Sequence, residues 1–542
     1  MGKNFLPLIT IGAFVALATS PLLHEGFPPT HDGEYHVIRF YEFYKTLASG
    51  EFYPRWSQGL NNGFGLPLFN FVYPLPNYVA AIFHTIGYSF IDSFKYSLIM
   101  ATLLGAIGFY YFAKYFTGKL AATVGAILYV FTPYRFVDIY VRGSIGELWS
   151  LAFIPLLLWS LAVLIKEKKL IYFCLSALFF TLLIFSHNIL AVLFSPFLIT
   201  YIVLLILQNK KKKISSCLAF GSVLLGLGSS SLFWLPALLE KRFTRGLEVY
   251  DYKTSFTDLA SLLFPSWGTG FAGEVANGMS TQIGSVNLLI IFMSLIVVLL
   301  RFSKQNKLYL FSLVWIFLVI LLMLPLSVPV WEAVPLFSFV QFPWRYLSLL
   351  ILLCSLAAAF LIAVSRFKKI SAIILVAFAV FTTIHYTKPA YYHDRDDSHY
   401  LTRANFTQGT NSPGNAFNTL WIDRPLKKKD RLIEVISGKG NVSELEVAPE
   451  RYFFRVDAAA PLKVLVNTAY FPGWRAYSPG NSLSIERSNE GLMQISLPEG
   501  EYFVTMKFAD TMVRSVGLIT SFLSFLIIVG TGIYSLTKKP IL

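Results

Sequence analysis

The sequence has little cysteine and little charge. Its 542 residues include only 3 cysteines and 14% charged residues, whereas 55% are hydrophobic. Cys174, Cys217 and Cys354 lie far apart in apolar stretches, so neither a disulfide framework nor a cysteine-based metal site is indicated. One soluble globule cannot be built from this composition, because its surface would have to be polar. The composition therefore predicts a chain that folds in a lipid bilayer.

Several catalytic motifs are also missing. The sequence has no phosphate-binding loop of the nucleotide hydrolases, no dinucleotide-binding glycine motif after a strand, no HExxH pair and no serine nucleophile elbow. Nucleotide hydrolysis, hydride transfer and zinc proteolysis are therefore unsupported. The apolar runs also lack the buried charged pairs and paired broken helices that are typical of ion-coupled transporters.

What the sequence has instead is a series of long apolar runs. A helix needs about 20 apolar residues to cross roughly 30 Å of hydrocarbon. Pro74 and Pro76 interrupt the run at 69–91, which we interpret as helices lying at the outer surface. We predict about a dozen spans, at residues 5–22, 96–116, 120–134, 148–165, 170–186, 190–207, 214–239, 286–300, 308–326, 346–364, 370–386 and 513–536.

Basic clusters indicate how these spans are oriented, because short cytoplasmic loops are enriched in Lys and Arg. With the run at 69–91 outside, all the clusters fall on the cytoplasmic side: Lys3, Lys114, Lys119, 166–169, 210–213, 301–307, 366–369, Lys538 and Lys539. We therefore predict a multi-pass protein of the cytoplasmic (inner) membrane with both termini in the cytoplasm. The net charge of +15 then reflects contact with anionic membrane lipids and not with nucleic acid.

The chain divides into three parts. Residues 1–386 form the multi-span domain, with a first outer loop at 23–95 and a short second outer loop at 135–147. Residues 387–512 form an extracytoplasmic β-rich domain, which we expect to be a small β-sandwich after a polar loop at 391–430. Residues 513–542 hold the last span and a cytoplasmic tail. The expected strands, separated by Pro-Gly turns, are 452–456, 462–467, 483–486, 492–497 and 502–508.

The first outer loop is the richest in residues that could carry chemistry. Asp32, His36 and Arg39 follow one another at i, i+4 and i+7, so on a helix they would share one face. A carboxylate held beside a cation stays ionised and can accept a hydrogen bond or coordinate a metal. The plainer interpretation is that Asp32 or Thr30 only caps a surface helix.

Two later segments add polar residues near the predicted outer ends of spans. Arg142 and Glu147 could belong to the same site, or Glu147 could only orient the start of a helix through the helix dipole. Ser186-His187-Asn188 lies between two apolar runs. Polar residues at that depth usually face the interior of the bundle or a wet cavity, although a turn between helices explains them equally well.

Trp344 and Arg345 stand at the predicted outer end of another span. A guanidinium pairs with phosphate oxygens while its stem stays in the apolar layer, which suits a lipid-linked phosphate. Anchoring of the helix at the membrane interface explains the same two residues without a ligand.

Several motifs, taken in order, resemble those of the pyruvoyl-tetrahydropterin-synthase-related membrane proteins. Two segments near the end, Tyr470-Phe471-Pro472-Gly473-Trp474 and Pro498-Glu499-Gly500, are similar to the terminal β-domain of YfhO-like membrane proteins. Both groups resemble GT-C-type glycosyltransferases. The motifs that carry the first resemblance are His31-Asp32, His36, Arg39, Gly50-Glu51-Phe52-Tyr53-Pro54-Arg55-Trp56, Gly63-Phe64-Gly65-Leu66-Pro67, Tyr73-Pro74-Leu75-Pro76-Asn77-Tyr78, Ser186-His187-Asn188 and Gln341-Phe342-Pro343-Trp344-Arg345.

The resemblance implies a GT-C-like helical membrane fold and the transfer of a sugar from a polyprenyl-phosphate donor to a cell-envelope acceptor. It makes Asp32, Glu34 and Glu147 the expected catalytic residues, with Asp32 at the family's first-loop acidic position. The His-Asp-Gly-Glu pattern departs from a paired acidic motif, so the role of Glu34 and the need for a divalent cation, Mg²⁺ or Mn²⁺, stay open; Asp32, His36 and Glu147 are the candidate ligands. The expected substrate-binding residues are His31, His36, Arg39, Arg55, Arg142, His187, Asn188, Trp344 and Arg345.

Two other functions fit the same residues. A transporter or flippase for a lipid-linked saccharide would use the same cavity without bond chemistry. A non-catalytic scaffold would bind a carbohydrate or an assembly partner through its β-domain. Polar residues in several outer loops favour the transferase over the scaffold, and they separate it less well from the flippase.

Overall fold

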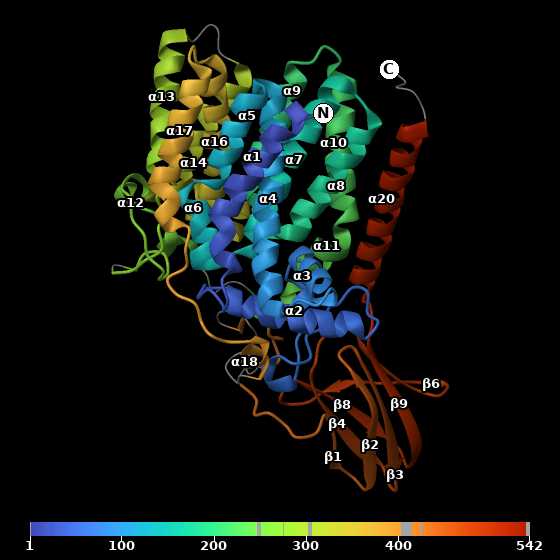
Figure 1. The fold of residues 1–542 in the computed structure, drawn as a ribbon. Helices are drawn as coiled ribbons and strands as arrows, with labels where there is room; N and C mark the ends of the chain where they lie inside the picture. Colours follow the sequence, from blue (N-terminus) through green and yellow to red (C-terminus); the bar gives the residue numbers. More distant parts are fainter. Residues whose placement is uncertain are drawn as a thin grey trace.

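The structure is a computed structural model that describes residues 2–246, 251–274, 276–301, 306–402, 415–422 and 425–537. Figure 1 shows a bundle of long helices with a β-domain beyond one end of it. Two helices, α2 (Gly33–Ala48) and α3 (Leu75–Thr85), lie between the bundle and the β-domain. The last helix, α20 (Met512–Thr537), leaves the β-domain and runs back along the bundle.

Long apolar stretches form the helices of the bundle. Within the described residues, seven helices are long and apolar enough to cross a membrane, or up to ten spans if each bent pair counts as one. Two further apolar helices, α8 and α13, are shorter; twelve spans and their sidedness stay predictions. The remaining bundle elements are α1 (Gly2–Thr19), α4 (Phe90–Thr117), α5 (Lys119–Val130), α6 (Pro133–Phe136), η4 (Val137–Arg142), α7 (Ile145–Glu167), α8 (Leu170–Ser186), α9 (Asn188–Leu207), α10 (Lys212–Ser229), α11 (Ser231–Leu239), α13 (Ser285–Arg301), α14 (Lys307–Met323), α16 (Leu347–Val364) and α17 (Lys368–Thr383).

Short helices connect these elements at the end of the bundle nearer the β-domain or flank the outer segments. They are η1 (Ser20–Leu23), η2 (Asn61–Gly63), η3 (Leu68–Asn70), η5 (Lys241–Phe243), η6 (Tyr252–Ser255), α12 (Leu259–Leu263), η8 (Pro325–Ser327), α15 (Val328–Ala333), η9 (Pro335–Val340), η10 (Pro343–Tyr346), η11 (Ile384–Tyr386) and α18 (Asp397–Thr402). The run at 69–91 contains α3, which has 11 residues. At about 1.5 Å per residue, this helix covers only about half of the hydrocarbon layer. The interpretation of this run as a surface segment fits that length.

Three helix pairs are sharply bent at a short break. The bend is 50° between α5 and the α6–η4 segment, 69° between α10 and α11, and 91° between α14 and the η8–α15 segment. Pro133 and Pro325 each begin a new helical segment, because proline has a helix-compatible φ but no N–H for the preceding turn. The bend between α5 and the α6–η4 segment shows that the outer loop expected at 135–147 is wrong in its first part. Residues 135–142 are helical and buried, not an exposed loop, because their charged side chains pair inside the protein.

The basic junctions between helices lie together at the end of the bundle away from the β-domain (Figure 1). They join α4 to α5, α7 to α8, α9 to α10 and α16 to α17. This common end is what the charge pattern predicted, and the compartment that it faces stays a prediction. Lys538, Lys539 and residues 302–305 lie outside the described residues.

The β-domain consists of two antiparallel sheets, which confirms a β-rich domain before the last helix. One sheet has the order β1-β4-β8-β7 and the other β2-β3-β9-β5-β6. Buried residues of β3, β4, β8 and β9 form its core; they alternate along β3 and are nearly continuous along β4. The strands are β1 (Ile433–Ser437), β2 (Gly440–Ala448), β3 (Arg451–Ala458), β4 (Leu462–Ala469), β5 (Trp474–Ser478), β6 (Asn481–Leu483), β7 (Glu486–Arg487), β8 (Leu492–Leu497) and β9 (Gly500–Phe508).

The strand expected at 483–486 is wrong. Leu483 ends β6 in one sheet and Glu486 begins β7 in the other, so the chain crosses between the sheets there. The strands β1, β2 and β5 were not expected from the sequence. In β2 the pairing register shifts between Glu444 and Glu446, so Val442 and Leu445 are three residues apart and the apolar residues do not keep the period of two that identifies a strand. Part of the loop expected at 391–430, residues 403–414 and 423–424, lies outside the described residues.

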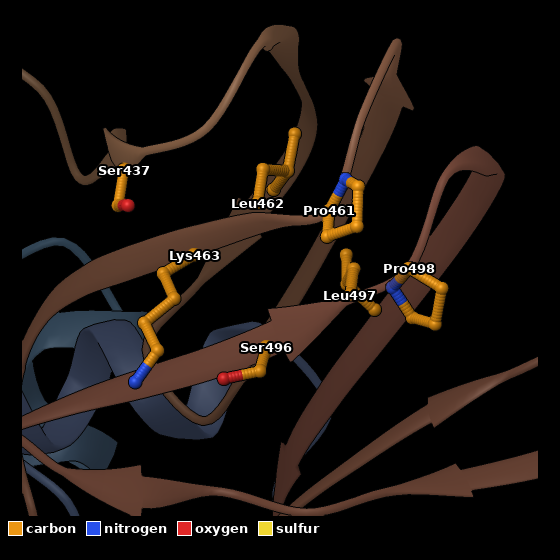
Figure 2. A pocket seen from close by; sticks show the side chains of 7 residues that line it. All are labelled: Ser437, Pro461, Leu462, Lys463, Ser496, Leu497 and Pro498. Atoms are coloured by element: carbon orange, nitrogen blue, oxygen red, sulfur yellow. The ribbon is translucent and has the colours of Figure 1, made fainter.

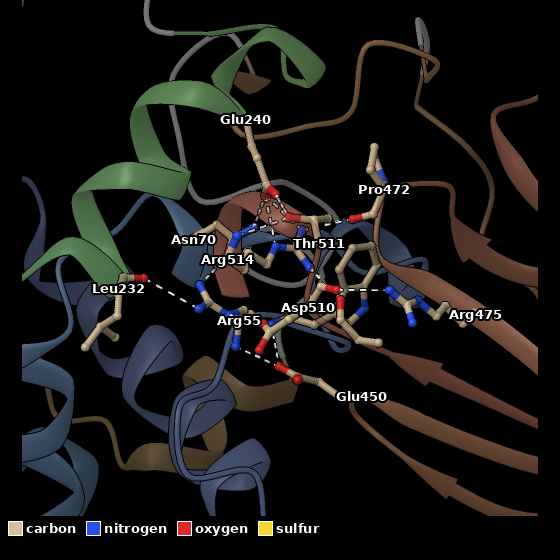
Figure 3. A network of polar contacts seen from close by, with 12 residues as sticks. Arg55, Asn70, Leu232, Glu240, Glu450, Pro472, Arg475, Asp510, Thr511 and Arg514 are labelled. Atoms are coloured by element: carbon tan, nitrogen blue, oxygen red, sulfur yellow. Dashed lines mark hydrogen bonds and ion pairs between the residues drawn. The ribbon is translucent and has the colours of Figure 1, made fainter. Parts of the chain in front are cut away.

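A buried polar network joins the β-domain to the bundle (Figure 3). Its centre is the ion pair between Arg514, at the start of α20, and Glu240, at the end of α11, with Nη2 2.9 Å from Oε2. Both side chains are almost completely buried. Asn70 of the first outer loop and Thr511 also donate hydrogen bonds to Glu240. Three segments that are distant in the sequence are thus held at one carboxylate.

The turn before β5 is part of this network. Arg514 donates hydrogen bonds to the carbonyl oxygens of Pro472 and Ala509. Gly473 has φ +118°, and a Cβ there would lie 2.5 Å from Nη1 of Arg514. Only glycine suits this position, because it must combine a positive φ with close contact to the guanidinium. The Phe-Pro-Gly-Trp motif therefore serves the junction of the two parts.

The first outer loop also packs into the β-domain. Trp56 lies in its hydrophobic core, 5.4 Å from Trp474 between ring centroids. The carboxylate oxygen Oε1 of Glu450 accepts hydrogen bonds from the backbone N–H groups of Arg55 at 2.6 Å and Trp56 at 2.8 Å. Burial raises the pKa of Glu450 from 4.5 to about 7.

The raised pKa of Glu450 predicts that this junction weakens as the pH rises. Between pH 4.5 and 7 the folded protein holds a proton on Glu450 that the unfolded chain has released. Stability from this group is therefore fully present below pH 4.5 and is lost as the pH rises through 7, by at most roughly 3 kcal/mol. Thermal unfolding of the purified protein in detergent at pH 5 and pH 8 measures the loss. The neutral variant Glu450→Gln is expected to show a smaller difference between the two pH values; an unchanged difference would contradict the assignment.

Candidate functional site

A buried ion cluster lies at the end of the bundle nearer the β-domain. Glu147, in the first turn of α7, is completely buried. Its Oε1 lies 2.8 Å from Nη2 of Arg142 and 3.0 Å from Nε of Arg345. Its Oε2 accepts hydrogen bonds from Tyr134 at 3.0 Å and Ser348 at 3.4 Å. One carboxylate thus joins four residues from α6, η4, η10 and α16.

The two arginines are themselves fixed by further contacts. Arg142 pairs with Asp138 at 2.6 Å, and its guanidinium lies 4.7 Å from the ring centroid of Trp344. Nη1 of Arg345 donates to Gln341 Oε1 at 2.7 Å, and this glutamine has a positive φ of 68°. A charged group held by several partners is preorganised, so it can stabilise new charge without rearranging.

The local sequence explains how the cluster forms. Residues 137–142 form a π-helix, which often occurs at functional sites because it changes the direction of side chains within a helix. It ends at Gly143, which is left-handed, and α7 begins two residues later. Glu147 therefore has two roles at once: it lies at a helix N-terminus, where the dipole favours an anion, and it pairs with both arginines.

The first outer loop is attached directly to this cluster. The backbone N–H of His31 donates to the carbonyl oxygen of Val141, and that of Asp32 to the carbonyl oxygen of Arg142, both at 2.9 Å. Asp32 precedes α2 at its N-cap position, but its side chain makes no capping hydrogen bond. The carboxylate is exposed, and within the described part of the chain it has no hydrogen bond or ion pair. The expected cation directly beside Asp32 is therefore not found there.

Asp32 nevertheless belongs to the same electrostatic environment as the cluster. The phenol of Tyr73 is buried, which raises its pKa to about 12, and the charges of Arg39, Asp32, Glu147 and Arg345 all act on it. Tyr73 is thus near enough to Asp32, Glu147 and Arg345 for the charges of all three to act on its phenol. Asp32, Glu147 and Arg345 are drawn from three segments more than 100 residues apart, and they converge on one end of the bundle.

Two histidines line the inner side of this region. His187 ends α8, packs its ring 4.9 Å from that of Tyr73, and accepts a hydrogen bond at Nδ1 from the N–H of Leu190. His36 is buried against Phe94, and burial together with the nearby Arg39 lowers its pKa well below its ordinary value. A buried neutral imidazole can position a substrate or a neighbouring side chain. Asn188 follows His187 as the first residue of α9 and is half-buried.

The structure places three other candidate residues elsewhere. Arg55 belongs to the junction with the β-domain, where it contacts Asn70 and Asp510. Glu34 pairs with Arg395 at 3.1 Å, which fixes α2 to the segment after α17. His31 binds the carbonyl oxygen of Thr269 through Nε2, at the edge of the site.

The candidate ligands of a divalent cation do not fit one. In the part of the chain that the structure describes, no three His, Cys, Asp or Glu side chains lie close enough together to hold a metal ion. Glu147 is neutralised by two guanidiniums, which oppose a further cation. Asp32, His36 and Glu147 are therefore not combined in a metal site.

Several residues of the site were not among the candidates from the sequence: Tyr134, Asp138, Gln341, Tyr73 and Ser348. Tyr73 was seen only as part of a proline-rich motif, and Ser348 as part of an apolar span. The spacing of Ser348, three residues after Arg345, was an available signal, since residues three apart share a helix face. No local pattern could have linked Tyr73 to Glu147, because their proximity depends on tertiary packing.

A separate recess of about 500 Å³ lies on the β-domain (Figure 2). It is found where β4 begins and β8 ends, whereas the other end of β4 contacts the first outer loop through Ala469. The ion cluster is therefore not part of it. Its lining residues are Ser437, Pro461, Leu462, Lys463, Ser496, Leu497 and Pro498.

Comparisons with known proteins identify relatives of this chain. The family model described as "6-pyruvoyl-tetrahydropterin synthase related domain; membrane protein" matches residues 69–390, more than half of the chain. An uncharacterised protein of Lactococcus lactis subsp. cremoris (strain MG1363) is 25% identical over 243 residues, which cover 43% of this chain and 40% of that protein. The match thus spans less than half of the relative's length.

Two solved structures of the Archaeoglobus fulgidus oligosaccharyltransferase are distantly similar. The apo form is 13% identical with a TM-score of 0.45, covering 78% of this chain and 57% of that chain. The complex with Zn and sulfate is 12% identical with a TM-score of 0.39, covering 73% and 53%.

Proposed function

Because this chain belongs to the family of 6-pyruvoyl-tetrahydropterin-synthase-related membrane proteins, we propose that its ion cluster serves a membrane glycosyltransferase. The donor would be a sugar linked to polyprenyl phosphate, and the acceptor a component of the cell envelope. One observation carries the proposal: the exposed Asp32 is attached to a buried cluster that contains two fixed arginines. A reactive base and preorganised cations are what such a transfer requires.

In the proposed reaction, Asp32 accepts the proton of an acceptor hydroxyl. The hydroxyl oxygen bonds to the anomeric carbon of the sugar while the bond from that carbon to the phosphate oxygen breaks. The phosphate leaves with the electron pair, and its negative charge grows in the transition state. Arg345 of the cluster and the half-buried Arg39, seven residues after Asp32, would stabilise this charge.

The polyprenyl chain has apolar surface available near the same site. Phe264 and Phe271 are 68% and 67% exposed. The ring of Phe271 lies 4.7 Å from that of His31, the residue before Asp32. An apolar chain entering from the membrane along these rings would bring its phosphate to the exposed side of the cluster.

The proposed function requires one orientation of the protein in the membrane. The cluster and the β-domain would face the extracytoplasmic side of the cytoplasmic membrane, with about twelve spans and both termini in the cytoplasm. The basic junctions at the opposite end would then contact anionic lipids. The described candidate ligands do not fit a divalent cation, and the proposed roles of Asp32 and the arginines need none.

Lipid analysis of a deletion strain tests the proposed function. Without the transferase, the glycosylated polyprenyl phosphate is expected to accumulate, since its sugar has no route to the acceptor. Mass spectrometry of the extracted lipids measures the carrier, and its mass identifies the sugar. A plasmid copy of the wild-type gene is the control and should remove the accumulation.

The flippase alternative gives a different result in vitro. Purified protein in vesicles that contain the extracted carrier would move the carrier across the bilayer without changing its mass. The proposed transferase would instead release unglycosylated polyprenyl phosphate when the acceptor fraction is added. Movement without loss of the sugar would overturn the transferase.

A further inference from the structure

Asp32 is attached to the ion cluster through Arg142. The guanidinium of Arg142 pairs with Glu147 and Asp138, while its carbonyl oxygen accepts the N–H of Asp32. From this arrangement we propose that Gly143 is a positioning residue: it lets the chain before α2 approach the π-helix and so fixes Asp32 over the cluster. This inference rests on the proposed function, because the position of Asp32 matters for catalysis only if Asp32 is the base of the transfer.

The π-helix makes this attachment possible. A helix leaves its last carbonyl groups without partners inside the helix. Here the carbonyl oxygens of Val141 and Arg142 are satisfied by the N–H groups of His31 and Asp32, each at 2.9 Å. The two hydrogen bonds set the backbone of the first outer loop, and with it the direction of the Asp32 side chain.

Gly143 has a conformation and a location that only glycine suits. Its φ of +64° is left-handed, which costs most residues about 1 kcal/mol or more. A Cβ at this position would lie 2.5 Å from Oγ1 and 2.9 Å from Cβ of Thr30, and 3.2 Å from the backbone nitrogen of Gly33. All three atoms belong to residues beside Asp32, so any side chain at 143 would displace this stretch of chain.

Thr30 shows how closely the two segments meet. It is 8% exposed, and its hydroxyl has no hydrogen-bond partner among the described residues. Its Oγ1 and Cβ are also the two atoms nearest to the position that a Cβ at residue 143 would take. The contact between Thr30 and Gly143 therefore has little room to adjust.

Backbone hydrogen exchange tests the inference without any assay of transfer. In the purified full-length protein, the peptide that contains the amides of residues 30–33 is followed by mass spectrometry. Gly143→Ala is expected to speed exchange of this peptide about tenfold, because the hydrogen bonds of His31 and Asp32 open more often. The combination of Gly143→Ala with Thr30→Gly removes the two nearest atoms, Oγ1 and Cβ of Thr30, and should restore slower exchange.

The matched control is Gly63→Ala. Gly63 also has a positive φ, +84°, but nothing lies within 4 Å of a Cβ built there. An alanine at position 63 causes the same kind of backbone strain but does not contact Thr30. Exchange at residues 30–33 should therefore stay at the wild-type rate. Wild-type exchange in Gly143→Ala, or no restoration in the double variant, would overturn the inference.

The two proposals can fail separately. If the protein transfers no sugar, the exchange result still shows whether Gly143 maintains the backbone hydrogen bonds of His31 and Asp32. If transfer occurs, Gly143→Ala should lower kcat while the KM for the lipid donor stays near the wild-type value, because the base is displaced and the cations are not. A variant with normal kcat and faster exchange would show that the position of Asp32 does not limit the reaction.

Discussion

Replacing Asp32 with asparagine is expected to lower the rate of glycosyl transfer by about 10²- to 10⁴-fold, the usual contribution of a general base. Asparagine has nearly the same shape but cannot accept the proton of the acceptor hydroxyl. The fold should be unaffected, because the side chain is exposed and makes no hydrogen bond or ion pair with the described residues. Release of polyprenyl phosphate from the labelled donor measures the rate.

Glu25→Gln is the matched control for this experiment. Glu25 is an exposed acid in the same outer loop, seven residues before Asp32. Its neutralisation changes the net charge of the loop by the same amount without touching the cluster. Full activity in Asp32→Asn, or equal losses in the two variants, would remove Asp32 as the base.

Replacing Glu147 with glutamine is expected to cause the largest loss of stability. The substitution leaves the guanidiniums of Arg142 and Arg345 buried with one fewer negative charge, and breaking a buried ion pair in this way costs about 3–5 kcal/mol. Tyr134 and Ser348 also lose a charged acceptor. The shift in the thermal unfolding midpoint in detergent measures the effect.

Glu167→Gln provides the comparison on the same helix. Glu167 lies at the other end of α7, where it pairs with Lys169 and both side chains are partly exposed. Such surface pairs contribute about 0–1 kcal/mol, so this midpoint should hardly move. If Glu147→Gln unfolded at the same temperature as Glu167→Gln, the buried cluster would not be a major source of stability.

The site was only partly predictable from sequence. Asp32, Glu147 and Arg345 each stood out, because a charged residue at the end of an apolar run is costly and therefore informative. Their pairing was not predictable, since residues 147 and 345 are 198 positions apart. Arg55 shows the opposite case: its motif was conspicuous, yet the structure uses it to join the first outer loop to the β-domain.

The fold was predictable to a similar degree. Helices formed wherever apolar runs were long, because each backbone polar group in a bilayer must be satisfied within its own segment. In the β-domain, the strands that supply most of the core, β3, β4, β8 and β9, were found, whereas β2, which is exposed on both faces, and the five-residue strands β1 and β5 were not. The second outer segment was misjudged because the charges of residues 138–147 suggest exposure, and only their mutual pairing makes burial favourable.

The sequence by itself determined a membrane protein with many apolar helices, a β-rich part before the last helix, and basic junctions at one end. These features depend on the composition of the chain and on the spacing of apolar residues within short segments, and both can be recognised without knowing which segments meet. The tertiary structure decided which charges meet: Glu147 with two arginines, Glu240 with Arg514, and Asp32 with the end of a π-helix. Ion pairs and backbone contacts between distant segments form only when packing brings them together, so no local pattern records them.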